Sequence, residues 1–424
     1  MNSALSASAS PGSDRHGTLD GASGAATGSR EHASFRGDIE GLRGVAVLSL
    51  LAVHLFPQWV SGGFVGVDIF FVISGFLVSD GLFKAHEAHD FRLGDFYARR
   101  IRRIVPALSV VLFFCLVFSV LFTYPAAARQ IGEGVITGAF FVSNLTLWQD
   151  ALQLNRAAQQ GPLTHLWWLG IEAQFCVVWP LAVALMFKHR RWALHAIVAM
   201  LVASLLLSAL LAGSASSAHL LLPLTRGWEL MAGALLAYLM RYVGQGPVAC
   251  REARLCGGRA SPRVADAFGF GGLALLALAV WLVDGATALP TAWAVLPTLG
   301  TVALLAAGPQ AWVNRALLAH PVLRFYGAIS FGLYLWHWPL LCFPAVLGMP
   351  LTPELRVIIL TASVVLAALT FELVDRQAQA GTRRTGRPVV TVAVLIAVAL
   401  CGWYVQSTNG LFASFPATMQ QAPL

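Results

Sequence analysis

Apolar residues are grouped along the chain into runs of helical length, and short polar segments separate these runs. Runs of about 17 to 25 apolar residues are typical of helices that cross a membrane. The pattern predicts an all-α polytopic membrane protein. Eleven spans are expected, at 44–60, 64–83, 104–124, 165–187, 193–212, 219–240, 267–284, 291–308, 326–347, 355–374 and 388–406.

Basic residues lie mainly in the polar segments between these runs. The densest group is Arg92, Arg99, Arg100, Arg102 and Arg103. Basic residues are enriched in the cytoplasmic loops of membrane proteins. The N-terminus is therefore expected in the cytoplasm and the C-terminus outside. The loops expected inside are 84–103, 188–192, 241–266, 309–325 and 375–387.

The run at 134–148, GVITGAFFVSNLTLW, is short and contains Gly, Ser, Asn and Thr. If it crossed the membrane, the basic loops 188–192 and 241–266 would fall outside the cytoplasm. Non-helical backbone at membrane depth is tolerated only where protein or a wet cavity surrounds it. We therefore interpret this run as a re-entrant or interfacial segment on the outer side.

The composition agrees with a membrane protein and excludes several other classes. Hydrophobic residues make up 57% of the chain and charged residues 11%, whereas a soluble domain has about 25% charged residues. The net charge of +8 lies in the loops, so it does not indicate nucleic-acid binding. The six cysteines are scattered and predict neither a metal site nor a disulfide framework. Residues 1–35 are rich in Ser, Gly and Ala, and we expect a disordered cytoplasmic tail.

Ionisable side chains occur inside the first two apolar runs, where they are costly. Arg43 and His54 are 11 residues apart, so they share one helix face, roughly 16 Å apart along the axis. Asp68 opens the second run. Two interpretations are open: a structural His–Asp contact between neighbouring helices, or a catalytic imidazole that a carboxylate orients.

Six segments resemble the membrane-bound acyltransferase-3 family and occur in that family's order. They are EGLRGVAVLSLLAVHLF (40–56), GVDIFFVISGFLVS (66–79), FYARRIRRIVP (96–106), LTHLWWLGIEAQF (163–175), TRGWELMAGALLA (225–237) and SFGLYLWHWPL (330–340). The resemblance implies a ten-helix membrane domain over 36–380. The eleventh span and NGLFASFP (409–416) resemble the linker of members that continue into a periplasmic SGNH-type domain. We expect 381–424 to form this extra helix and a short periplasmic tail, with the SGNH-type domain absent or supplied by a separate partner.

The resemblance also implies a function. Members of the family transfer an acyl group, commonly acetyl, from cytosolic acyl-CoA to a hydroxyl of a surface polysaccharide or another glycan, such as lipopolysaccharide. The expected location is the bacterial inner membrane. The expected partners are the lipid bilayer, acyl-CoA as the donor, and a glycan acceptor, without a metal ion or nucleic acid.

The catalytic residues that the resemblance implies are His54, Asp68 and Glu172. The donor's phosphates are expected at Arg43 and at an RRxxR motif made of Arg99, Arg100 and Arg103. Guanidinium groups suit phosphates because they form charge-assisted bidentate hydrogen bonds. The alternative is that the motif anchors the topology or contacts lipid headgroups.

The substrate-binding residues that the resemblance implies are His165, Arg226, Glu229, Ser330, Tyr334 and His337. His165 and Glu172 are seven residues apart and share a helix face, although Gly170 and Ala173 replace a Ser and a Glu that relatives usually carry. Arg226 and Glu229 are also spaced to form a purely structural ion pair. Ser330, Tyr334 and His337 share one helix face, although aromatic residues also mark membrane interfaces.

Two other functions remain open at this point. Buried His, Asp, Glu and Arg residues could form the proton relay or substrate path of a transporter that exports a lipid-linked sugar. A catalytically inactive sensor is a further possibility.

Overall fold

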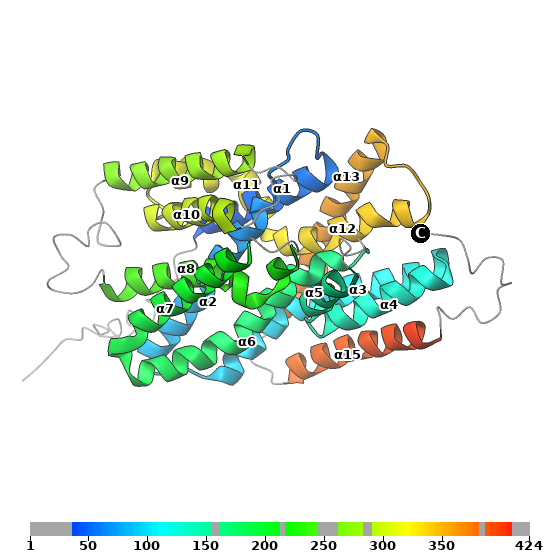
Figure 1. Ribbon diagram of the computed structural model, residues 1–424, viewed down its shortest axis with the longest axis horizontal. Helices are drawn as coiled ribbons and strands as arrows, with labels where there is room; N and C mark the ends of the chain where they lie inside the picture. Colours follow the sequence, from blue (N-terminus) through cyan, green and yellow to red (C-terminus); the bar gives the residue numbers. More distant parts are fainter. Residues whose placement is uncertain are drawn as a thin grey trace, which may run out of the picture. The chain divides into compact units, whose positions relative to one another are not determined.

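The computed structural model describes residues 36–154, 161–212, 217–243, 262–282, 291–380 and 386–408. Within these ranges every regular element is helical, which confirms the all-α class (Figure 1). The expected tail 1–35, most of loop 241–266 and the stretch 409–424 lie outside the described residues. The α-helices are α1 (Gly37–Leu55), α2 (Val65–Glu87), α3 (Leu93–Phe122), α4 (Pro125–Ala139), α5 (Ser143–Leu154), α6 (Trp167–Lys188), α7 (Ala193–Leu211), α8 (Pro223–Tyr238), α9 (Pro262–Leu282), α10 (Thr291–Ala307), α11 (Pro321–Ala328), α12 (Ser330–Val346), α13 (Pro353–Thr370), α14 (Arg376–Ala380) and α15 (Gly386–Ser407).

Short turns of other helix types extend several of these helices. The 3-10 turns are η1 (Thr164–Leu166), η2 (Arg190–Trp192) and η3 (Ser217–Leu221). The π-helical turns are η4 (Leu239–Val243), η6 (Val313–Leu318) and η7 (Phe371–Asp375). Because η1 leads directly into α6, it places the chain around His165 at the start of that helix.

Each of the eleven expected spans has a helical counterpart, but fewer of these helices meet the requirements for a span. Seven helical segments in the described residues are long and apolar enough to cross a membrane, or eight if the bent pair α11 and α12 forms one span. Of the others, α1 carries Asp38, Glu40 and Arg43, and α8 and α10 have only 16 and 17 residues. The number of spans therefore stays a prediction.

The run 134–148 does not form one helix. It divides between α4 and α5, and the chain turns between them at Phe141, whose φ is 56°. The Gln174 amide nitrogen on α6 donates hydrogen bonds to the Phe141 carbonyl oxygen and to Asn144 Oδ1, at 3.0 and 2.9 Å. A polar side chain of α6 thus satisfies the backbone at this break.

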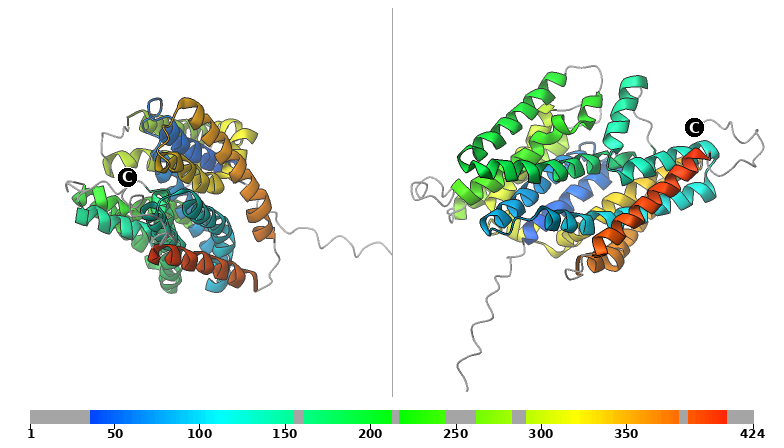
Figure 2. Two further views of the ribbon diagram at one scale, coloured as in Figure 1. Left: turned by 90° about the vertical axis from the view of Figure 1, so that its right-hand side faces the viewer. Right: turned by 90° about the horizontal axis from the view of Figure 1, so that it is seen from below.

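Glycines allow two pairs of helices to pack with their backbones in close contact. A Cβ at Gly75 of α2 would collide with the Leu230 carbonyl oxygen of α8, and a Cβ at Gly233 of α8 would collide with the Val72 carbonyl oxygen. Small residues at such crossings are a common device in membrane proteins. In the same way Gly132 of α4 lies against the backbone of α15, and α15 packs along α3 and α4 (Figure 2).

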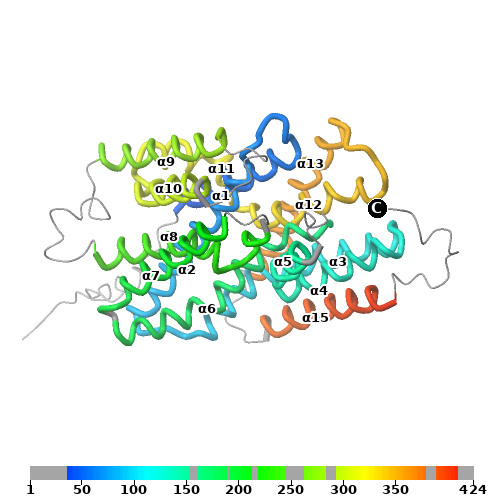
Figure 3. Tube along the Cα trace, viewed as in Figure 1, coloured from blue at the N-terminus to red at the C-terminus, as the bar shows by residue number. Residues whose placement is uncertain are grey.

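Helices α1 and α12 are distant in the sequence and pack against each other (Figure 3). Helix α12 begins at Ser330, after a bend of 67° from α11. Its side chains at 330, 334 and 337 are buried. The bend therefore directs one face of α12 into the interior of the bundle, where α1, α2, α3 and α6 also contribute side chains.

Candidate active site

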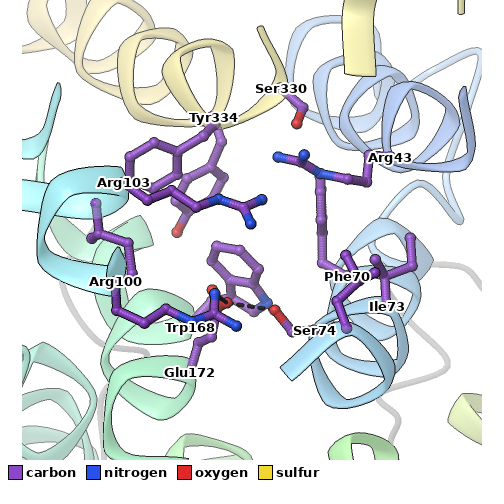
Figure 4. A pocket seen from close by; sticks show the side chains of 13 residues that line it. Arg43, Phe70, Ile73, Ser74, Arg100, Arg103, Trp168, Glu172, Ser330 and Tyr334 are labelled. Atoms are coloured by element: carbon purple, nitrogen blue, oxygen red, sulfur yellow. Dashed lines mark hydrogen bonds and ion pairs between the residues drawn. The ribbon is translucent and has the colours of Figure 1, made fainter. Parts of the chain in front are cut away.

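A pocket in the interior collects three of the expected arginines from two helices. We call it the arginine pocket. It is lined by Arg43 of α1; Phe70, Ile73, Ser74 and Leu77 of α2; Arg100, Arg103 and Ile104 of α3; Trp168 and Glu172 of α6; and Ser330, Phe331 and Tyr334 of α12. The guanidinium groups of Arg43 and Arg103 extend toward one another from opposite walls (Figure 4).

Positive charge exceeds negative charge in this pocket. Glu172 is the one carboxylate among the lining residues, against three guanidinium groups. It lies 3.9 Å from Arg100 Nη1 and accepts a short hydrogen bond from the Ser74 hydroxyl. Arg43 and Arg103 have no carboxylate partner within ion-pair distance in the described part of the chain. Partly buried cations in excess over the neighbouring carboxylate favour the binding of an anion.

The three arginines of the RRxxR motif do not all lie on the same face of α3. Helix α3 begins at Leu93, so the whole motif is helical. Arg100 and Arg103 are three residues apart and face the pocket, as expected for one helix face. Arg99 is exposed and does not line the pocket.

Three imidazole rings form a second group, which we call the histidine cluster: His54 of α1, His165 of η1 and His337 of α12. His54 Nδ1 and His337 Nε2 are 3.2 Å apart, and the two ring planes are nearly parallel, with centroids 5.3 Å apart. The ring centroids of His165 and His337 are 6.0 Å apart. The structure therefore brings together three histidines that the sequence places far apart.

Tyr334 connects the arginine pocket with the histidine cluster. Its side chain lines the pocket, and its hydroxyl donates a short hydrogen bond to the His165 carbonyl oxygen. Ser330, Tyr334 and His337 follow one another along a face of α12, spanning about 10 Å at 1.5 Å per residue. The two groups are thus neighbouring parts of one site.

The expected contact between Asp68 and His54 is not formed, and this corrects the sequence prediction. Asp68 Oδ1 instead accepts a hydrogen bond from Arg226 Nη2 at 2.5 Å. Arg226 Nη1 also lies 3.1 Å from Glu229 Oε1. Asp68 lies in the first turn of α2, which packs against α8. There the guanidinium of Arg226 forms a stronger, charge-assisted hydrogen bond with the carboxylate than a neutral imidazole would.

We call Asp68, Arg226 and Glu229 the α2–α8 ion cluster. All three side chains are buried, and none of them lines the arginine pocket. The guanidinium of Arg226 also lies 5.4 Å from the ring centre of Phe71. The geometry therefore matches the structural ion pair that the spacing of Arg226 and Glu229 allowed, and it joins α2 to α8.

Sequence reasoning missed the apolar lining of the pocket, its two further side chains with hydrogen-bonding groups, Ser74 and Trp168, and the partner of His54. Ser74 is a polar residue within the apolar run after Asp68, and this was the available signal for it. Trp168 gave no signal, because tryptophan is common at membrane interfaces. No spacing rule relates His54 to His337, which are 283 residues apart.

Comparisons with known proteins place this geometry in context. The protein-family model described as "Acyltransferase domain" matches residues 36–373. YrhL of Bacillus subtilis is 32% identical over 326 residues, which are 73% of this chain and 49% of that protein. The peptidoglycan O-acetyltransferase OatA of Listeria monocytogenes is 27% identical over 349 residues, which are 80% of this chain and 54% of that protein. The O-acetyltransferase OatA of Staphylococcus aureus is 29% identical over 367 residues, 82% of this chain and 57% of that protein.

The chain spans about half the length of these curated relatives. No protein of known structure matches it.

Proposed function

Because this chain belongs to the acyltransferase-3 family, we propose that it is an integral-membrane O-acyltransferase of the bacterial cytoplasmic membrane. The transferred group is acetyl, carried by cytosolic acyl-CoA, and the acceptor is a hydroxyl of a cell-wall glycan. All three relatives are named O-acetyltransferases, and YrhL and the Listeria OatA are named for peptidoglycan, which supports this acceptor class over lipopolysaccharide. The N-terminus lies in the cytoplasm, and an SGNH-type protein is a candidate partner outside.

The observation that carries the proposal is the excess of positive charge in the arginine pocket. Coenzyme A carries a diphosphate and a ribose phosphate, and Arg43, Arg100 and Arg103 offer guanidinium donors from two walls of one cavity. Arginine pairs with phosphate through paired, charge-assisted hydrogen bonds. The residues present therefore fit the anionic part of the donor.

The distance from the pocket to the histidine cluster suits the rest of the donor. Arg43 and His54 are 11 residues apart on α1, roughly 16 Å along the helix. An extended pantetheine arm separates the diphosphate of coenzyme A from its thioester. With the diphosphate in the arginine pocket, the thioester would extend toward His54. Ser74 lines the pocket and would therefore lie near the phosphates and not near the thioester.

The reaction then needs a base near the thioester. His54 accepts the proton of the acceptor hydroxyl as the hydroxyl oxygen attacks the thioester carbonyl carbon. The tetrahedral intermediate collapses, the carbon–sulfur bond breaks, and the leaving thiolate takes up the proton from His54, which returns to its neutral form. His165 lies in the same cluster, and neither of its buried ring nitrogens has a hydrogen-bond partner in the described residues. We expect it to contact the acceptor or the developing oxyanion.

The test is acyl transfer by purified full-length protein in detergent, where no membrane gradient exists. Labelled acetyl-CoA is incubated with peptidoglycan fragments and, separately, with other glycans, and label in the glycan is measured. Replacing the general base, in His54→Ala, should lower the rate by about 10²- to 10⁴-fold without reducing the amount of folded protein. His189→Ala, at an exposed histidine, is the matched control.

Two results would contradict the proposal. Label that never reaches any glycan, together with transport of a lipid-linked sugar in vesicles, would favour the transporter. Full activity of His54→Ala at matched amounts of folded protein would remove His54 from catalysis.

A further inference from the structure

The protons in the hydrogen bond between His54 and His337 can be assigned from the surroundings of His337. His337 Nδ1 lies 2.7 Å from the Tyr334 carbonyl oxygen and 3.1 Å from the Leu333 carbonyl oxygen. A carbonyl oxygen can only accept a hydrogen bond, so Nδ1 of His337 must carry a proton. The other nitrogen of a neutral imidazole, Nε2, then has a free lone pair.

Both rings are neutral in the resting protein. His337 is 1% exposed, and in the described residues no carboxylate forms a hydrogen bond or ion pair with it or with His54. A second proton on His337 would create a buried charge without a partner, which is expensive. His337 Nε2 is therefore the acceptor, and His54 Nδ1, 3.2 Å away, is the donor.

We propose that His337 is a positioning residue that holds His54 in its Nδ1-protonated tautomer, so that Nε2 of His54 carries the basic lone pair. That Nε2 then removes the proton of an acceptor hydroxyl rests on the function proposed above. The tautomer itself follows from the hydrogen bonds of His337 and from the neutrality of the two rings. In serine hydrolases a carboxylate orients the histidine, whereas here a neutral ring has that role.

The same hydrogen bond persists through the proposed reaction. When His54 Nε2 accepts a proton, the ring becomes an imidazolium that still donates from Nδ1 to the lone pair of His337. The hydrogen bond between nearly parallel rings, at an interplanar angle of 16°, and the contact of His54 with Trp338, at a centroid distance of 4.7 Å, limit rotation of the His54 ring. His337 therefore stabilises both the basic and the protonated form of His54 in one orientation.

The deciding experiment is 15N NMR of full-length protein with 15N-labelled histidine in detergent or nanodiscs. A nitrogen without a proton resonates well downfield of a protonated one, and loss of signal in His54→Gln assigns the ring. We expect His54 to show Nδ1 protonated and Nε2 unprotonated, although histidine in water prefers the opposite tautomer. A wild-type His54 with Nε2 protonated and Nδ1 unprotonated would overturn the proposal, and this measurement needs no variant of His337.

Two substitutions test whether His337 acts on His54 through its hydrogen bond or only through the packing of its ring. His337→Phe keeps a flat ring but cannot accept a hydrogen bond, so His54 should return to the Nε2-protonated tautomer. His337→Gln offers a side-chain oxygen acceptor in place of Nε2 and should keep the Nδ1-protonated form. His189→Gln, at an exposed histidine, is the control and should leave the His54 signals unchanged. An unchanged His54 tautomer in His337→Phe would overturn the proposal.

Kinetics supply the second readout. In His337→Phe we expect kcat to fall by about 10²- to 10⁴-fold, the usual range for a lost general base, while KM for acyl-CoA stays within about twofold because the arginine pocket is intact. His337→Gln should recover part of kcat. If the wild type shows the expected tautomer but transfers no acyl group to any acceptor, the proposed function fails and the tautomer assignment stands.

Discussion

The arginine pocket and the α2–α8 ion cluster bury guanidinium groups in the same bundle with opposite balances of charge. The pocket has Arg43, Arg100 and Arg103 around one carboxylate. The ion cluster has one guanidinium, that of Arg226, between two carboxylates. The side chains of the cluster close on one another, whereas those of the pocket surround a cavity.

This difference in charge balance distinguishes buried charges that stabilise the fold from buried charges that bind a ligand. A buried charge that its own neighbours neutralise contributes to structure, and losing one partner is strongly destabilising. Cations that remain in excess around a cavity are costly to the empty protein and become favourable when an anion enters. Substitutions in the cluster should therefore change stability, and substitutions in the pocket should change ligand affinity.

The largest effect is expected from Arg226→Met. This change leaves Asp68 and Glu229 buried without a cation, which should cost about 3–5 kcal/mol of unfolding free energy. Thermal unfolding of purified protein in detergent would show it as a lower Tm, with a lower yield of folded protein. Adding Asp68→Asn and Glu229→Gln to the same chain should restore part of the loss, because the carboxylate charges are then absent. A Tm equal to that of the wild type would contradict the structural role of the cluster.

The next effect is stabilisation of the wild type by coenzyme A. A ligand that binds only the folded state at 100 times its Kd stabilises the protein by about 2.7 kcal/mol. A rise in Tm with increasing coenzyme A measures this effect, and Arg103→Ala should reduce it. An equal rise in both proteins would place the donor's phosphates away from Arg103.

A smaller effect is expected on donor affinity from Arg103→Ala. Hydrogen bonds to charged groups contribute about 1.5–3 kcal/mol, so KM for acyl-CoA should rise by about 10- to 100-fold. Tm should not fall, because the change relieves repulsion between guanidinium groups. Arg103→Lys should restore the affinity only in part, since a point charge replaces a bidentate donor. Steady-state kinetics at several donor concentrations checks both variants, and an unchanged KM in Arg103→Ala would exclude a phosphate contact.

The smallest effect is expected from Arg99→Ala, the matched control within the same motif. Arg99 is exposed on α3 and does not line the pocket, and surface substitutions usually change stability by less than about 0.5 kcal/mol. Both KM and Tm should therefore stay close to those of the wild type. A rise in KM comparable to that of Arg103→Ala would show that Arg99 also contributes to donor binding. It would contradict the assignment of donor binding to Arg100 and Arg103 alone within the motif.

Sequence reasoning predicted which side chains share a face of one helix, and it missed contacts between side chains of two different helices. Helical periodicity placed Arg43 and His54 on one face of α1 and aligned Ser330, Tyr334 and His337 on α12. For the RRxxR motif, helical spacing allows either Arg99 or Arg100 to share a face with Arg103, and it could not decide which of the two faces the interior. That choice depends on where α1, α6 and α12 pack against α3.

Helical spacing could not predict which side chains of different helices contact each other. Asp68 is close to His54 in the sequence and was a reasonable candidate to orient it. Its actual partner, Arg226, is 158 residues away, and His337 is 283 residues from His54. Apolar helices of similar length can pack in many orders, and hydrophobic patterning gives no information about which neighbours meet. The all-α class and the family were therefore accessible from the sequence, while these pairings needed the structure.

The first two turns of α12 have a mechanical consequence. Ser330 and His337 lie in the same α-helix, and about two helical turns join them. Such a segment moves as a rigid rod, and one end of it lines the arginine pocket. A ligand that displaced Ser330 would therefore shift His337 in the same motion and change its distance to His54. Occupancy at one end of the site would thus be transmitted to the imidazoles at the other without any loop rearrangement.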